Sequence, residues 1–186
     1  MNLSIIIYIA LFFLLSELYV AFSKRSRKPN TQQQKDKKSL WLFWGLIPLS
    51  ITLGFMFAKD SAWNQTNQII AYTGILIALS GLVIRWIAIK QLKNNFTIDV
   101  AIVQNHQLIT GGLYQKTRHP AYLGLWLFAI GLAIAMNSFW SCFIITTAFS
   151  IAIYYRIKVE EQLLEKTFGD NYRTYKNKTA VFFPFP

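Results

Sequence analysis

The sequence contains little of what metal sites, disulfide scaffolds and most soluble enzymes are built from. Its one cysteine, Cys142, cannot form a disulfide within the chain and has no partner at a zinc-ligand spacing. The two histidines, His106 and His119, are too few for a metal cluster without several carboxylate partners, so we expect no metal. There is also no Gly-x-Gly-x-x-Gly or phosphate-loop motif, no Gly-x-Ser-x-Gly turn and no His-Glu-x-x-His pair. These absences argue against the common nucleotide-binding, serine-hydrolase and zinc-peptidase designs.

Acidic residues are scarce as well. Eight Asp and Glu stand against 19 Lys and Arg, which gives a formal net charge of +11. Such an excess can indicate nucleic-acid binding, but most of the basic residues gather in residues 24–39 and in the tail, beside apolar blocks. Charges that flank apolar blocks are typical of a membrane protein and set its orientation. We therefore expect membrane lipids, and no nucleic acid, around this chain.

Long apolar runs, separated by short polar segments, dominate the rest of the sequence. Apolar residues make up 54% of the chain. A run of about 20 apolar residues is long enough for one helix to cross a bilayer. The sequence predicts an all-α integral membrane protein with about five transmembrane helices. The predicted spans are residues 3–22, 40–58, 69–90, 121–136 and 139–157.

The basic loop at residues 24–39 predicts the orientation of these spans. It carries seven basic residues and one acidic residue, and by the positive-inside rule it belongs in the cytoplasm. The N-terminus then lies outside, and an odd number of spans places the C-terminus in the cytoplasm. We expect one continuous membrane domain, in which residues 1–90 hold three N-terminal spans. Residues 91–186 hold a core with a long polar cytoplasmic loop, two spans and a tail.

The last two spans are predicted to form a helical hairpin. Only Asn137 and Ser138 separate them, which leaves room for a tight turn alone. The final helix is predicted to continue to about Phe168, because Gly169 is a typical stop signal.

Two charged residues fall within predicted spans. We interpret Glu17 as lying near the interface beside the basic loop, with a functional role as the alternative. Arg85 lies one turn from the cytoplasmic end of its span, where we expect the side chain to snorkel to the surface, with a ligand contact as the second interpretation. In the same span, Gly74, Ala78 and Gly81 recur at helical spacing and predict a face for close helix packing.

The hairpin brings two polar motifs to one membrane face. The segment 118–120, Arg-His-Pro, opens the fourth span, and a polar stretch follows the fifth. Arg156 and Glu160 in that stretch share a helix face; they form either a plain ion pair or a functional pair whose guanidinium holds a carboxylate. Glu161 is expected to be solvated. His119 is either an ordinary residue at the membrane interface before the span or a residue that contacts a ligand.

These motifs together resemble the isoprenylcysteine carboxyl methyltransferase family, whose wider group includes phospholipid methyltransferases. The resemblance rests on GLYQKTRHPAYLG, a hydrophobic hairpin, RIKVEEQLLEKTFGDNYRTYKNKT and a Pro-rich end, and it covers roughly residues 92–186. His-Pro-x-Tyr-x-Gly alone is weak, whereas its combination with Arg-x-x-x-Glu-Glu and Phe-Gly-x-x-Tyr-x-x-Tyr is specific. The resemblance implies an S-adenosylmethionine-dependent enzyme with a cytosolic cofactor pocket. The lipid chain of a prenylcysteine-like substrate would enter from the bilayer.

The resemblance also implies roles for individual residues. It assigns Arg156 to the substrate carboxylate, and it makes Arg156 and Glu160 the residues that carry catalysis. It leaves Asp99 and Gln104 as alternatives for one further cofactor contact. The residues that it assigns to the cofactor are His106, Gln107, Leu108, Ile109, Tyr114, His119, Pro120, Ala121, Tyr122 and Glu160.

Three functions remain open at this point. Methyl transfer to a carboxylate needs no general base, because the nucleophile is already ionised and catalysis comes from alignment and exclusion of water. N-methylation of a lipid headgroup is the first alternative, but an amine acceptor must lose a proton and gains nothing from Arg156. A non-enzymatic membrane partner subunit is the second. The tail carries no retention signal, which favours a prokaryotic plasma membrane.

Overall fold

The structure is a computed structural model that describes residues 3–24, 37–59, 68–98, 100–102 and 106–182. Most of the predicted basic loop lies outside these residues. Within them the chain is helical throughout, apart from short connections. In chain order the helices are α1 Leu3–Ser23, α2 Lys37–Lys59, α3 Gln68–Leu92, η2 Lys93–Asn95, η3 Gly112–Gln115, α4 Pro120–Ala135, α5 Phe139–Phe168 and α6 Asp170–Lys178.

The helices confirm an all-helical membrane protein, and they confirm the five predicted spans in part. In the part of the chain that is described, α1, α2, α3 and α5 are long and apolar enough to cross a bilayer. The fourth, α4, has 16 residues, so it is about 24 Å long and shorter than a hydrocarbon core of about 30 Å. Helices α1, α2 and α3 begin and end within a few residues of their apolar runs, whereas α5 continues well beyond its run to Phe168. Helical structure across each run pairs the backbone groups that would be too costly unpaired inside lipid.

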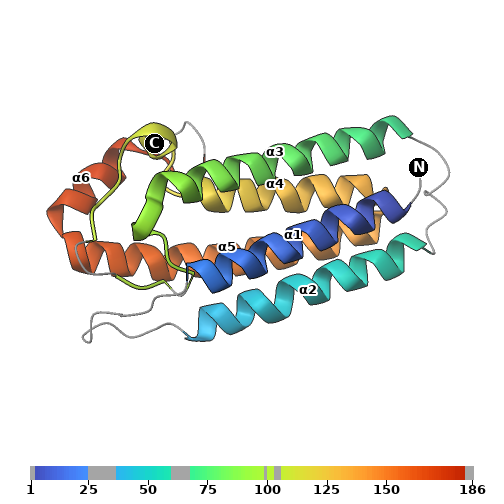
Figure 1. Cartoon of the computed structure of the whole chain (residues 1–186), viewed down its shortest axis with the longest axis horizontal. Coiled ribbons are helices and arrows are strands. Elements are labelled where there is room, and N and C mark those ends of the chain that lie inside the picture. Colours follow the sequence, from blue (N-terminus) through green and yellow to red (C-terminus); the bar gives the residue numbers. More distant parts are fainter. Residues whose placement is uncertain (1–2, 25–36, 60–67, 99, 103–105, 183–186) are drawn as a thin grey trace.

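The five long helices lie alongside one another in one bundle (Figure 1). At one end of the bundle, α1, α3 and α5 finish and α2 and α4 begin. The short helix α6 and the segment that joins α3 to α4 gather at this same end, opposite the start of α1 (Figure 1). The polar segments of the sequence therefore meet at one end.

Helices α3 and α4 pack with their backbones in contact. A Cβ atom on Gly81 would lie 2.5 Å from the carbonyl oxygen of Gly124, and a Cβ atom on Gly124 would lie 2.5 Å from that of Gly81. Gly74 meets the backbone of Gly131 and Ala135 in the same way. The predicted small-residue face is confirmed, and it holds the start of α4 rigidly against α3.

A buried ion pair joins α1 to α3, and both predictions for its members were wrong. The Nε and Nη2 atoms of Arg85 donate to the two carboxylate oxygens of Glu17, each at 2.6 Å. The third contact of Arg85 is Nη1 to the carbonyl oxygen of Ala121 in α4, at 3.1 Å. Each residue is 3% exposed, so neither side chain reaches the interface. Two opposite charges on adjacent helices neutralise each other inside the bundle, which removes the need to snorkel.

The end of α5 and the tail also differ in part from expectation. Gly169 ends α5 as predicted, with φ at +53°, a conformation that favours glycine. The chain then forms α6, which the sequence analysis did not predict. Beyond α6, Ala180 forms a parallel bridge with Thr117, and its carbonyl oxygen accepts a hydrogen bond from the backbone N–H of Arg118 at 2.9 Å. The tail thus returns to the entrance of α4.

Candidate active site

A cavity that is partly open to solvent lies at the α6 end of the bundle, and the space within it and at its mouth is about 800 Å³. The walls come from the end of α3, the segment leading to η3, the first turn of α4, the end of α5 and α6. Nearly all of the predicted cofactor residues line it. They are His106, Gln107, Leu108, Ile109, Tyr114, His119, Ala121, Tyr122 and Glu160.

Four predicted residues are not part of this wall. Pro120 is the first residue of α4, where its fixed φ suits the start of a helix, and it is buried behind the cavity. Arg156 lies next to the cavity rather than on its lining. Asp99 and Gln104 lie outside the described residues, so the choice between them stays open.

The first turn of α4 places two side chains in the wall. The carbonyl oxygen of His119 accepts the backbone N–H groups of Tyr122 and Leu123, at 3.1 and 3.0 Å. These bonds fix the start of the helix and, with it, His119 and Tyr122. The two rings lie 5.8 Å apart between centroids.

Arg156 is bonded to a tyrosine of the cavity wall. The Nε atom of Arg156 donates to the Tyr122 hydroxyl at 3.3 Å, and Tyr122 and Glu160 both line the cavity. Arg156 is 4% exposed. Its Nη2 atom donates to the carbonyl oxygen of Ile98, and its guanidinium lies 5.6 Å from the centre of the Phe43 ring. Residues from α2, α4 and the segment after η2 therefore fix the arginine next to the cavity.

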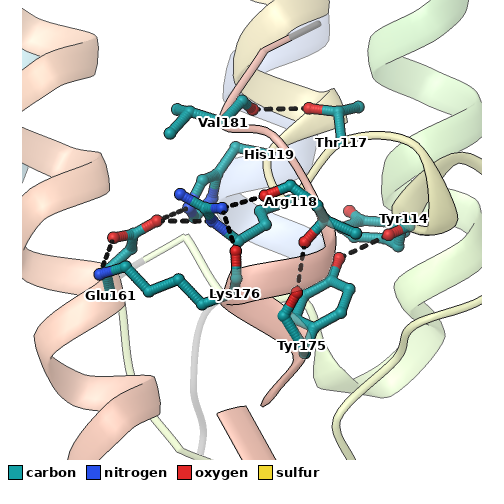
Figure 2. A network of polar contacts seen from close by, with 9 residues as sticks. Tyr114, Thr117, Arg118, His119, Glu161, Tyr175, Lys176 and Val181 are labelled. Atoms are coloured by element: carbon teal, nitrogen blue, oxygen red, sulfur yellow. Dashed lines mark hydrogen bonds and ion pairs between the residues drawn. The ribbon is translucent and has the colours of Figure 1, made fainter. Parts of the chain in front are cut away.

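Glu161 is the centre of a second polar network, shown in Figure 2, and the prediction that it is solvated was wrong. Its carboxylate accepts from Arg118 Nε at 3.0 Å and Lys176 Nζ at 2.8 Å, and it lies 3.3 Å from His119 Nε2. Arg118 also donates to the backbone carbonyls of Lys176 and Thr179. The side chain of Glu161 is 15% exposed. This network holds the entrance of α4, the end of α5 and α6 together, so the predicted meeting of the two polar motifs is confirmed.

Two tyrosines, Tyr114 and Tyr175, and His106 form another part of the cavity wall. The Tyr175 hydroxyl donates to the carbonyl oxygen of Tyr114 at 2.6 Å, which ties α6 to η3 (Figure 2). Burial, followed by the charge of Glu160, raises the pKa of Tyr114, so its phenol stays neutral. Burial also lowers the pKa of His106, although the nearby Glu160 charge opposes the shift. His106 therefore stands in the wall as a neutral imidazole near pH 7.

Comparisons with known proteins decide the family. Residues 74–166 match the family model "Isoprenylcysteine carboxyl methyltransferase (ICMT) family". A protein-S-isoprenylcysteine O-methyltransferase of Schizosaccharomyces pombe is 32% identical over 163 residues, which cover 79% of this chain and 67% of the relative. The chain belongs to the isoprenylcysteine carboxyl methyltransferase family. A probable protein-S-isoprenylcysteine O-methyltransferase of Oryza sativa subsp. indica is 32% identical over 122 residues, and the match spans 62% of each chain.

A solved structure supports the fold. The structure of the eukaryotic intramembrane Ras methyltransferase ICMT superposes with a TM-score of 0.69 at 24% sequence identity, covering 74% of this chain and 52% of that one. The chain is thus a multi-pass integral membrane protein with an ICMT-like fold. It spans about three fifths of the length of the rice relatives and about half of the solved chain.

Several residues of this ICMT-family cavity were missed by the sequence analysis. Tyr172 and Tyr175 were within reach, because they are the two tyrosines of the Phe-Gly-x-x-Tyr-x-x-Tyr motif and lie three residues apart on one face of α6. Leu163 and Leu164 carry no comparable signal. The lining residues before His106 carry no such signal either, because a segment with an irregular backbone has no periodic sequence pattern. These are Asn95, Phe96, Thr97, Val100, Ala101 and Ile102.

Proposed function

We propose that this protein transfers a methyl group from S-adenosylmethionine to the carboxylate of a prenylated cysteine or a similar lipid-linked acid. One observation carries the proposal: a buried guanidinium, that of Arg156, donates to the Tyr122 hydroxyl in the cavity wall, which Glu160 also lines. An arginine fork suits a carboxylate, and an acid suits a cationic cofactor. The arrangement places the site for each reactant next to Tyr122.

The lining of the cavity fits S-adenosylmethionine in its chemistry. Such a cofactor has a cationic sulfonium, an amino-acid end and a nucleoside, so it needs both polar and apolar contacts. The wall offers the Glu160 carboxylate beside leucines and aromatic rings. Two of its buried polar atoms, His106 Nδ1 and the Tyr172 hydroxyl, have no hydrogen-bond partner among the described residues. Unpaired buried polar atoms in a cavity wall favour a bound polar ligand.

The main role of this chain in the reaction is alignment. When bound, S-adenosylmethionine supplies a methyl group on sulfur; a new O–C bond forms to the acceptor carboxylate, the S–C bond breaks, and its electron pair stays on a neutral thioether. Arg156 binds the carboxylate and turns one oxygen toward the cavity. One of its partners, the Ile98 carbonyl, is neutral, and a carboxylate is a stronger acceptor than a carbonyl because both partners then carry charge.

Tyr122 places the two reactants next to each other. Its hydroxyl accepts from Arg156, and Tyr122 and Glu160 line the same cavity, so the acceptor site at Arg156 adjoins the cofactor site. Arg156 is 4% exposed, and its burial limits water around the acceptor carboxylate, which favours a reaction that neutralises two opposite charges. Proton transfer is not required at any atom.

The proposal includes the orientation in the membrane. We place the cavity at the cytoplasmic face, with five spans, the start of α1 outside and α6 inside, in a prokaryotic plasma membrane. The seven basic residues at 24–39 and the clustering of polar segments at the α6 end support this orientation (Figure 1). The apolar surroundings of Arg156, including Phe43 of α2, support entry of the lipid chain from the bilayer.

The test is methyl transfer from labelled S-adenosylmethionine to a farnesylated cysteine analogue, by the full chain in lipid nanodiscs. The product is measured as base-labile methyl ester. Arg156→Ala should lower kcat/KM by about 100-fold or more, because it removes charge-assisted hydrogen bonds of about 1.5–3 kcal/mol each. Arg156→Lys keeps the charge without the fork and should recover only part of the loss. Arg173→Ala is the matched control, since that arginine is 63% exposed on α6.

The outcomes separate the possible acceptors. Ester that disappears in Arg156→Ala but persists in Arg173→Ala supports the carboxylate assignment. Cofactor binding without ester directs the search to lipid headgroup amines. An Arg156→Ala variant that turns over normally would disprove the role given to this arginine.

A further inference from the structure

Helix α6 presents two tyrosines to the cavity, and their hydroxyl groups differ. Tyr172 and Tyr175 both line the wall, and their ring centroids are 6.2 Å apart. The Tyr175 hydroxyl is satisfied by the carbonyl oxygen of Tyr114 at 2.6 Å. The Tyr172 hydroxyl is buried without any hydrogen-bond partner in the part of the chain that the structure describes. Tyr172 is 1% exposed, whereas Tyr175 is 9% exposed, so the less exposed tyrosine is the one left unpaired.

Two of the charged groups near Tyr172, Glu161 and Arg118, are already engaged with each other. Glu161 is held by Arg118, Lys176 and His119, and Arg118 also donates to two backbone carbonyls. Burial, followed by the negative charge of Glu161, raises the pKa of Tyr172, so the group is a neutral phenol near pH 7. A neutral phenol can both donate and accept one hydrogen bond. A buried group with this capacity unused favours a partner that the protein itself does not supply.

The position of Tyr172 is fixed by its surroundings, so the unpaired hydroxyl is not a feature of a loose side chain. Gly169, with φ at +53°, turns the chain between α5 and α6, and its carbonyl oxygen accepts the Tyr172 backbone N–H at 3.1 Å. One turn later, Lys176 is tied to Glu161. The α6 backbone is therefore held on both sides of this residue.

We propose that Tyr172 is a binding residue for the methyl donor, and that its hydroxyl forms a hydrogen bond with a polar group of S-adenosylmethionine in the cavity. The inference rests on the proposed function and gives a role to a motif tyrosine of α6 to which the resemblance assigned none. Tyr175, one turn away, has a different role: it ties α6 to η3 and so holds the wall in which Tyr172 stands.

Paired variants test the two roles in opposite ways. The full chain in lipid nanodiscs is titrated with S-adenosylhomocysteine by calorimetry, and the melting temperature is measured with and without this ligand. Tyr172→Phe should raise the Kd about tenfold, which corresponds to about 1.4 kcal/mol, and leave the melting temperature of the ligand-free protein unchanged. Tyr175→Phe should lower the ligand-free melting temperature, because it removes a hydrogen bond that the protein makes on its own.

Two results would overturn the inference. An unchanged Kd for Tyr172→Phe means that water, and not the ligand, serves the hydroxyl. A ligand-free melting temperature lowered as much as in Tyr175→Phe means that the hydroxyl has a protein partner. If the unmodified chain binds no S-adenosylhomocysteine, the proposed function fails and this inference with it. Normal binding by the unmodified chain together with an unchanged variant refutes this inference alone.

Discussion

Two ionic networks stabilise this protein, and they are built differently. Inside the bundle, Glu17 and Arg85 form one closed pair with two hydrogen bonds of 2.6 Å, and their side chains are 4% and 3% exposed. At the α6 end, Glu161 receives three basic side chains, is 15% exposed, and has longer contacts of 2.8 to 3.3 Å. The first network neutralises charge where no water can help. The second joins segments that are distant in sequence while staying partly hydrated.

The two networks lie in different parts of the protein, one inside the bundle and one at the candidate site. The closed pair joins α1, α3 and, through the Ala121 carbonyl, the start of α4. The second network, Glu161 with its three basic partners, is called the open network here. It joins the entrance of α4, the end of α5 and α6 around the cavity. We therefore expect damage to the closed pair to affect stability first, and damage to the open network to affect ligand binding first.

The largest effect is expected from breaking the closed pair on one side. Glu17→Ala leaves the Arg85 guanidinium buried with its charge uncompensated, which should cost about 3–5 kcal/mol of unfolding free energy. The control is the double variant Glu17→Met with Arg85→Met, which removes both charges and should restore most of the stability. The measurement is the melting temperature in nanodiscs. A double variant as unstable as the single one would mean that the pair contributes more than neutralisation.

An intermediate effect is expected at the open network. Glu161→Gln keeps the shape of the side chain but removes the charge that holds Arg118, His119 and Lys176, at a cost of about 1–3 kcal/mol. Because Arg118 and His119 line the cavity, the Kd for S-adenosylhomocysteine should rise by a larger factor than in Glu17→Ala variants that remain folded.

Salt distinguishes the two networks further. Raising ionic strength from about 0.1 to 1 M shortens the Debye length from about 10 to 3 Å and screens groups that water can reach. The difference in melting temperature between the unmodified chain and Glu161→Gln should therefore shrink in salt, while the difference for Glu17→Ala stays constant. Equal salt dependence of both differences would contradict the contrast drawn between them.

The smallest effect is expected on the outer face of α6. Arg173 pairs with Glu165 at 2.9 Å and Asp170 at 3.3 Å, but it is 63% exposed. Exposed pairs of this kind contribute little, because water solvates the separated charges almost as well. Arg173→Ala should leave both the melting temperature and the Kd for S-adenosylhomocysteine unchanged within error. A measurable loss of binding would mean that Arg173 also belongs to the open network.

The sequence predicts the helices and the meeting of the two polar motifs for a simple physical reason. Apolar run length determines where a helix can lie in lipid, and a two-residue turn at Asn137 and Ser138 forces α4 and α5 to lie side by side. Once that hairpin exists, Arg118 and Glu161 must lie at the same end. The family motifs then assigned nine of the residues that line the cavity.

The rest could not be predicted, because it depends on how helices are rotated. Glu17 and Arg85 lie 68 residues apart on helices that are apolar on every side, so no amphipathic pattern indicates that they face each other. Glu161 was expected to be solvated because its basic partners come from two separate segments. Helix α6 is short and polar, and it is stable only because its two tyrosines are buried against the rest of the protein.

The return of the tail to the entrance of α4 also determines when the site becomes complete. Ala180 bonds to Arg118, and Phe182 stacks on Trp126 with the ring planes 10° apart. Because synthesis runs from the N-terminus, helices α1 to α4 are made before these residues. A nascent chain that stops at Phe168 carries the membrane helices but lacks the α6 wall of the cavity. The site is therefore completed by a segment made after the bundle helices.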